Sequence, residues 1–286
     1  MEVTFWGVRG SIPAPGPGTT RYGGNTSCVS VRTTENALLV LDCGTGARNL
    51  GLALLADGAP DRFASGGGEA ALLLSHTHWD HIQGFPFFGP LYVPGNTFRI
   101  YGPAQSSALL EGILEGQMAP QYFPVQTLKN MGARIEIAAM AAGQPREILG
   151  CVVKTALNPH GRAGAMAFRI EQGGRVLVYA SDAGYDASGP SPEVLELYRG
   201  ADLLIHDSTY TPEDRLRYPE RGLASAIDAA AAAVRAGVRK LALFHYDQDY
   251  TDTDVDGLVE HARREVAAAG VAIEVCGAAE GATLTV

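Results

Sequence analysis

The most constraining feature of this chain is a short apolar run that ends in a cluster of metal-ligand side chains. Residues 70–74, Ala-Ala-Leu-Leu-Leu, read as a buried strand that stops at Ser75. Four candidate ligands follow within six residues: His76, His78, Asp80 and His81. Neutral imidazole and carboxylate groups suit zinc, iron or manganese. Because the chain has only seven histidines, three of them in six positions predict a metal site rather than a polar loop.

Further candidate ligands stand at or just after the ends of later apolar runs. They are His160, Asp182, His206 and His245. Taken singly, each of these histidines would more often be structural than functional. Folds that alternate strands and helices place their chemistry at the carboxyl ends of buried strands. The repeated arrangement therefore predicts that these side chains converge on the His76 cluster.

The glycine- and proline-rich segment 9–27 is predicted to be a loop, because its composition does not support regular structure. Arg9 and Asn25 in this segment could place hydrogen-bond donors near a bound anion, or they could simply fix the loop to the body of the protein. We take both as candidate substrate-binding residues. Asp42 ends another apolar run and could brace a ligand histidine through its second ring nitrogen.

Length and charge limit the class of protein. A chain of 286 residues can bury a large core within one unit, so we expect residues 1–286 to form a single domain. The net charge of −9 argues against a broad basic face that coats nucleic acid, but it permits a small anionic substrate near bound cations. The four cysteines are scattered, and we see no signal peptide or membrane-spanning run. We therefore expect a soluble, cytoplasmic protein without membrane contact.

The order and spacing of the candidate ligands resemble those of the metallo-β-lactamase superfamily. The motif is His76-Thr77-His78-Trp79-Asp80-His81, followed by His160, Asp182 and His245. The resemblance implies an α/β fold, the four-layer αβ/βα sandwich, with a dinuclear metal site at one edge of its two sheets. It implies two divalent ions, with Zn²⁺ expected and Mn²⁺ or Fe²⁺ as alternatives. By position, the first ion would be held by His76, His78 and His160, the second by Asp80, His81 and His245, and Asp182 would bridge them.

A narrower resemblance concerns residues 205–209, Ile-His-Asp-Ser-Thr, which are similar to a segment of ribonuclease Z and related phosphodiesterases. It implies that His206 is the general acid, with Asp80 as a second catalytic residue, and that a metal-bridging hydroxide attacks phosphorus. Residues 5–11 and 23–26 are similar to a bacterial branch related to cyclic nucleotide phosphodiesterases. Two positions depart from the pattern: Leu223 stands where a histidine is common, and Ala183 where a threonine is common.

These features together predict a metal-dependent hydrolase that cleaves a small or cyclic phosphodiester. The chain lacks the long basic arm by which ribonuclease Z grips transfer RNA, and it is acidic. We therefore expect a small-molecule phosphodiester as the partner and no extended nucleic-acid binding, and a homodimer is allowed. The alternatives are a lactone or thioester hydrolase on the same metals and an RNA-processing nuclease like ribonuclease Z. A diiron redox protein or a non-catalytic binding module is the weakest reading, because all seven ligand candidates are present.

Overall fold

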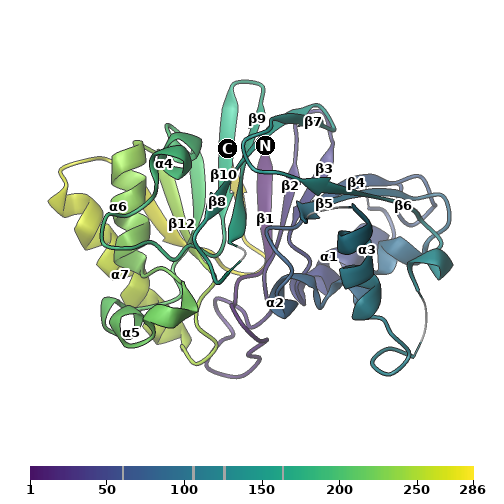
Figure 1. Ribbon diagram of the computed structural model, residues 1–286, viewed down its shortest axis with the longest axis horizontal. Coiled ribbons are helices and arrows are strands. Elements are labelled where there is room, and N and C mark those ends of the chain that lie inside the picture. The colour runs from purple at the N-terminus through teal and green to yellow at the C-terminus, as the bar shows by residue number, and fades with distance from the viewer. Residues whose placement is uncertain (60, 105–106, 125–126, 163) are drawn as a thin grey trace.

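The structure is a computed structural model of residues 1–286, and it describes all of them except residues 60, 105–106, 125–126 and 163. Within the described residues, fourteen strands form two sheets of seven strands each. The two sheets face one another, and helices cover their outer faces (Figure 1). This arrangement confirms the αβ/βα sandwich that we expected from the sequence.

The first sheet is built mainly from the N-terminal half of the chain. Its strands, in spatial order, are β14 (Thr283–Thr285), β1 (Glu2–Gly7), β2 (Cys28–Arg32), β3 (Leu38–Leu41), β4 (Glu69–Leu73), β5 (Thr97–Pro103) and β6 (Arg134–Met140). From β3 to β6 the neighbouring strands run parallel, so their carboxyl ends lie at one edge of the sheet.

The second sheet is built from the C-terminal half. Its strands, in spatial order, are β13 (Glu274–Gly277), β12 (Lys240–Phe244), β11 (Leu203–Asp207), β10 (Arg175–Ala180), β9 (Ala165–Gln172), β8 (Cys151–Asn158) and β7 (Arg146–Ile148). The strands from β10 to β13 are parallel. The carboxyl ends of β10, β11 and β12 are therefore adjacent, and the sequence places Asp182, His206 and His245 at or just after them.

The longer helices flank the two sheets on opposite sides (Figure 1). The α-helices are α1 (Gly46–Leu55), α2 (Trp79–Ile82), α3 (Ser107–Gly116), α4 (Pro192–Tyr198), α5 (Pro212–Arg217), α6 (Ala226–Ala236) and α7 (Asp252–Ala268). The short 3₁₀ turns are η1 (Phe85–Phe87), η2 (Gly89–Tyr92), η3 (Leu128–Asn130) and η4 (Pro219–Arg221). In the described part of the chain, no helix is both long and apolar enough to cross a membrane.

Strand β4 shows why an uninterrupted apolar run forms a strand here. Ala71 and Leu73 pack into the core between the two sheets, whereas Ala70 and Leu72 pack into the core under α1 and α3. Successive side chains point to opposite faces of a strand, so a strand buried on both faces needs apolar residues at every position. The apolar run ends where the strand is no longer buried on both faces, directly before the metal-ligand motif.

The alanine-rich helix is shorter at its start than the sequence suggests. The alanine-rich composition of residues 222–236 suggests a helix over this whole segment, but α6 begins only at Ala226. Ser225 caps it, because its hydroxyl accepts from the Asp228 backbone N–H while the Asp228 carboxylate accepts from the Ser225 backbone N–H. Residues 222–224 therefore connect η4 to the capped helix without regular structure, and Gly222 and Leu223 contribute to the site described next.

Candidate metal centre

The histidine motif occupies the turn that follows β4. His76 and His78 lie on the extended segment after the strand, and α2 begins at Trp79, so Asp80 and His81 belong to its first turn. A change from extended to helical backbone within six residues brings side chains together that one regular element would spread apart. The backbone N–H of Ser11 donates to the Asp80 carboxylate at 2.7 Å and fixes its direction.

The second sheet supplies the other candidate ligands from the ends of three of its strands. His160 follows β8, Asp182 follows β10, and His245 follows β12. Their ligand atoms and those of the histidine motif form three overlapping groups, each with all atoms within 4.8 Å of one another. The groups are His76, His78 and His160; His76, His81 and Asp182; and Asp80, His81 and His245. The structure thus brings all seven predicted ligands together at one edge of the sandwich.

Three histidines are oriented by a partner on the ring nitrogen that faces away from the centre. Nδ1 of His81 lies 2.8 Å from the Asp42 carboxylate, Nδ1 of His160 donates to the Gly222 carbonyl at 2.9 Å, and Nδ1 of His245 lies 3.0 Å from the Thr209 hydroxyl. The single hydrogen of the Thr209 hydroxyl is directed to the Asp207 carboxylate and the His245 carbonyl, so its oxygen accepts from His245 Nδ1. Each Nδ1 therefore carries the proton, which leaves the Nε2 lone pair free to coordinate a metal.

Asp42 connects several parts of the site. Its Oδ2 accepts hydrogen bonds from the Ser75 hydroxyl and from Tyr179, each at 2.7 Å, in addition to His81. Its Oδ1 accepts from the Ser75 backbone N–H at 2.6 Å. Asp42 is completely buried and has a left-handed backbone, with φ of +58°. The geometry thus gives Asp42 the bracing role that we anticipated for it.

The free ring nitrogens fit a bound metal ion. His160 Nε2 lies 3.1 Å from His78 Nδ1, and His81 Nε2 lies 3.3 Å from His245 Nε2. Since the outer nitrogens of His81 and His245 hold the protons, two lone pairs meet at the second of these contacts, and a shared cation would reconcile them. His76 Nε2 is buried and has no hydrogen-bond partner. Buried polar atoms seldom remain unpaired, so this nitrogen also fits a metal ligand.

The electrostatics of the site favour positive charge. Burial acts to lower the pKa of His245, but Asp182 and Asp80 outweigh it and raise that pKa to about 9. Burial likewise opposes protonation of His81, yet Asp80, Asp42 and Asp182 raise its pKa well above the ordinary value. The carboxylates therefore hold a cation at this point, whether a proton or a metal ion. Burial lowers the pKa of His76 well below its ordinary value, which keeps its imidazole in the neutral, metal-binding form.

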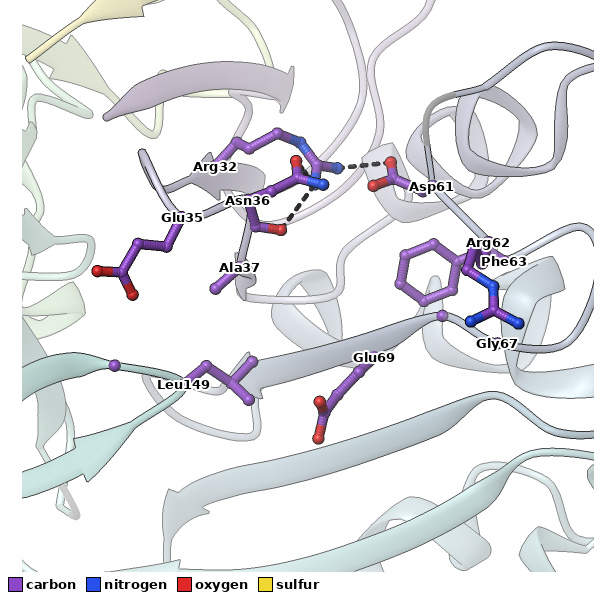
Figure 2. A pocket seen from close by; sticks show the side chains of 12 residues that line it. Arg32, Glu35, Asn36, Ala37, Asp61, Arg62, Phe63, Gly67, Glu69 and Leu149 are labelled. Carbon is purple, nitrogen blue, oxygen red and sulfur yellow. Dashed lines mark hydrogen bonds and ion pairs between the residues drawn. The ribbon is translucent and has the colours of Figure 1, made fainter.

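An open cavity of about 480 Å³ gives access to these groups. It is lined by five of the candidate ligands and by Ser11, Ile12, Arg221, Leu223 and Gln248. A different cavity, of about 460 Å³, lies at the other end of the first sheet, around the turn between β2 and β3 and the start of β4. Figure 2 shows that Arg32 in this second cavity is bound to Asp61, at 2.6 Å. Unlike those of the first cavity, the described residues that line it include no histidine or cysteine.

His206 does not reach the cavity. It is completely buried, with Nδ1 donating to the Asp207 carbonyl at 2.7 Å and Nε2 lying 3.0 Å from the Tyr185 hydroxyl. Burial lowers its pKa to about 4, so it holds no second proton near neutral pH. The geometry therefore contradicts the general-acid role that the local resemblance implies. The side chain points the other way because residues alternate faces along β11.

Arg9 and Asn25 also serve the structure rather than a ligand. Arg9 is completely buried, and its guanidinium donates to the backbone carbonyls of Gly23, Asp247 and Tyr250. Asn25 is bound to the Glu280 carboxylate through its side-chain amide. Neither residue lines the cavity, so of the two readings of this loop the structural one applies.

Sequence reasoning missed the polar residues that complete the cavity wall. Arg221 and Gln248 carry no motif, and Ser11 contributes a backbone N–H that a side-chain pattern cannot reveal. The nearest sequence signal was the departure at Leu223, which lines the cavity at the position where a histidine is common in the resembling phosphodiesterases.

Comparison with known proteins finds relatives and solved structures that span nearly the whole chain. The ribonuclease Z of Brevibacillus brevis is 26% identical over 299 residues, covering 91% of this chain and 89% of that protein. The structure of the metallo-β-lactamase fold protein YhfI from Bacillus subtilis has a TM-score of 0.68 at 22% identity, covering 99% of this chain and 98% of that one. Human tRNase Z, short form, has a TM-score of 0.67 at 21% identity, covering 100% and 99%.

These relatives correct one prediction. We expected a small-molecule phosphodiester and no extended nucleic-acid binding, but relatives that span most of the chain are named ribonuclease Z, so this expectation is wrong. The reasoning failed because net charge is summed over the whole surface, whereas a substrate meets the local field of its site.

The family of this chain is shown by a match between its sequence and a family model. Residues 38–246, which include all seven candidate ligands, match the profile of the beta-lactamase superfamily domain. Together with the two-sheet sandwich and the convergent histidines and aspartates, this match shows that the chain is a hydrolase of the metallo-β-lactamase superfamily, with relatives in its ribonuclease Z branch.

Proposed function

We propose that this protein is a metal-dependent phosphodiesterase that hydrolyses phosphodiester bonds of RNA. The observation that carries the proposal is the convergence of seven histidine and aspartate side chains on one open cavity that also contains an arginine. The relatives named ribonuclease Z support RNA as the substrate class.

In this proposal the seven residues hold two divalent ions. His76, His78 and His160 would bind one ion, Asp80, His81 and His245 the other, and Asp182 would bridge them. Such a pair of ions lowers the pKa of a shared water to near 7 and neutralises charge that develops on phosphate oxygens. Asp42, Gly222 and Thr209 keep three of the imidazoles turned toward the ions.

The cavity wall suggests how the leaving group is handled. Apart from the candidate ligands, its described residues are Ser11, Ile12, Arg221, Leu223 and Gln248. None of these side chains is an acid or base that titrates near neutral pH. Arg221 remains charged and can stabilise developing negative charge, but it cannot give up a proton. We therefore propose that this chain assists departure by electrostatic stabilisation from Arg221.

A substrate comparison tests the proposed function. Metal-loaded protein is assayed on a precursor transfer RNA with a 3′ extension, on bis(p-nitrophenyl) phosphate and on a lactone. We expect hydrolysis of both phosphodiesters and little turnover of the lactone. Asp182→Ala is expected to bind fewer than two ions and to lose most of this activity, because the bridging carboxylate is absent.

Asp186→Ala is the matched control, since Asp186 lies four residues later in the same loop and is exposed. It should retain its metal and activity. Rapid turnover of the lactone with no cleavage of either phosphodiester would replace the proposal with a carbonyl hydrolase.

A further inference from the structure

Arg221 lies beside the metal centre, on a segment that also accepts a hydrogen bond from the candidate ligand His160. It ends the 3₁₀ turn η4 and is followed by Gly222, whose φ is +62°. The Gly222 carbonyl accepts the hydrogen bond from His160 Nδ1. Because this turn connects directly to the imidazole, the position of Arg221 is coupled to the geometry of the metal centre. Among the described residues that line the metal cavity, Arg221 is the one lysine or arginine.

Neighbouring residues position the Arg221 side chain but, within the described part of the chain, leave several of its N–H donors without an acceptor. Its Nη1 donates to the Tyr210 hydroxyl at 3.0 Å, and its guanidinium carbon lies 5.0 Å from the centre of the Tyr218 ring. The Asp247 carboxylate is 3.9 Å away, too far for a hydrogen bond. The described contacts thus engage one nitrogen, and the remaining N–H groups of the guanidinium can bind an anion in a forked geometry.

A smaller cavity adjoins the metal cavity at this arginine. It measures about 140 Å³, and the two cavities share Arg221 and Gln248. Three tyrosines, Tyr210, Tyr218 and Tyr250, line it. The rings of Tyr210 and Tyr218 lie 5.9 Å apart, so they form an aromatic wall. The small cavity can therefore receive a flat ring attached to a group bound at the metals.

Gln248 supplies an independent sign of a ligand. Its side-chain nitrogen donates to the Asp249 carboxylate at 3.1 Å, but its Oε1 is buried without a hydrogen-bond partner. Buried acceptors are seldom left without a partner, so a donor from a ligand or a water is expected at this oxygen. The hydroxyls of a ribose are donors of the kind that this oxygen lacks.

We infer that the small cavity is a nucleoside subsite and that Arg221 binds the phosphate at its boundary with the metal cavity. The inference rests on the proposed function and specifies the substrate as a ribonucleotide unit. The phosphate lies between the metal centre and the guanidinium, the base or sugar ring packs against the tyrosines, and the Gln248 side chain, which lines both cavities, hydrogen-bonds to the ribose. The small cavity is also lined by Asp214, Asp247 and Asp249, whose carboxylates disfavour a second phosphate there and so set the orientation of the nucleotide.

Binding measurements test this subsite without requiring turnover. Metal-loaded protein is titrated by calorimetry with inorganic phosphate and with adenosine 5′-monophosphate. We expect the nucleotide to bind at least about tenfold more tightly than phosphate, since the aromatic wall and Gln248 contact only the nucleoside. Arg221→Met should weaken both ligands by about 10–100-fold, because a charge-assisted hydrogen bond is lost. Gln248→Ala should weaken only the nucleotide.

Arg217→Met is the matched control. Arg217 also lies over the Tyr218 ring, at 5.3 Å, but it lines neither cavity. It should bind both ligands like the unmodified protein. If Arg221→Met fails to fold, Arg221→Lys replaces it, because lysine keeps the charge without the forked geometry. Its affinity for both ligands should be lower than that of the unmodified protein, but by less than the 10–100-fold loss expected for Arg221→Met. Metal content and thermal melting are recorded for every variant.

The outcomes separate this inference from the proposed function. Equal affinity for phosphate and nucleotide, or unchanged binding in Arg221→Met, overturns the subsite even if the protein cleaves RNA. The expected binding pattern in a protein that hydrolyses no phosphodiester upholds the subsite and overturns the proposed function.

Discussion

Replacing Asp42 by Asn tests how the site fixes its histidines. Asn is the appropriate change because it tolerates the left-handed backbone at this position, where φ is +58°. Its remaining oxygen can still accept from the Ser75 backbone N–H. Its NH₂ group, however, then faces the three donors that Oδ2 serves: His81 Nδ1, the Ser75 hydroxyl and the Tyr179 hydroxyl.

The expected magnitude follows from these three contacts. The two hydroxyls can rotate and accept from the new NH₂ group, but the Nδ1–H of His81 cannot. One buried hydrogen bond to a charged group is therefore lost, which costs about 1.5–3 kcal/mol of stability. His81 can avoid this loss by moving its proton to Nε2, the nitrogen that faces the other ligands. Metal affinity should then fall by about 10–100-fold, as is usual when the partner of a ligand histidine is removed.

Two measurements check this prediction. Zinc affinity is obtained by competition with a chromophoric chelator, and stability by urea unfolding of the metal-free protein. Asp202→Asn serves as the control, because Asp202 also accepts a backbone hydrogen bond, from Val176, but lies at the opposite end of β11. It should cost stability without changing metal affinity. A zinc affinity for Asp42→Asn within about threefold of the unmodified protein would refute the bracing role.

Two further predictions concern packing and pH. A Cβ at Gly10 would lie 2.4 Å from His245 Cε1, so Gly10→Ala should displace this imidazole and weaken metal binding, whereas Gly16→Ala in the same loop, with no atom within 4 Å, should be neutral in the same chelator assay. The pKa of His206 is lowered from 6.5 to about 4, so between these values the unfolded chain binds more protons, and stability falls as the pH drops, by at most about 1.4 kcal/mol per pH unit. His206→Gln should remove this contribution, and urea unfolding at pH 7 and pH 5 would show no change in slope relative to the unmodified protein if the reasoning is wrong.

Local patterns in the sequence predicted the buried strand and the cluster of ligands, whereas the sandwich was implied by the resemblance to the metallo-β-lactamase superfamily. An apolar run followed at once by His76, His78, Asp80 and His81 fixes a buried strand and the position of its end. Parallel strands bring their carboxyl ends to one edge, so His245, which alone would more often be structural, becomes a candidate ligand once the His76 cluster is recognised.

The direction of a side chain at a strand end could not be predicted in the same way. On β11 a shift of one residue changes the face of the sheet. His206 points toward Tyr185, whereas the adjacent Asp207 accepts from the backbone N–H groups of Ala183 and Ala224 near the centre. Arg221 was missed for another reason. It lies on an irregular turn, and its approach to the cavity depends on a tertiary contact between Gly222 and His160.

The division of the ligands between the two sheets has a consequence for the lifetime of the protein. One group of candidate ligands follows β4 in the first sheet, and the other follows β8, β10 and β12 in the second, so a bound ion would act as a cross-link between the halves of the sandwich. At a free metal concentration 1,000 times the dissociation constant, each ion adds about 4 kcal/mol to the free energy of unfolding. Metal starvation should therefore expose the chain to unfolding and proteolysis, and the amount of this protein in a cell would follow the supply of its metal.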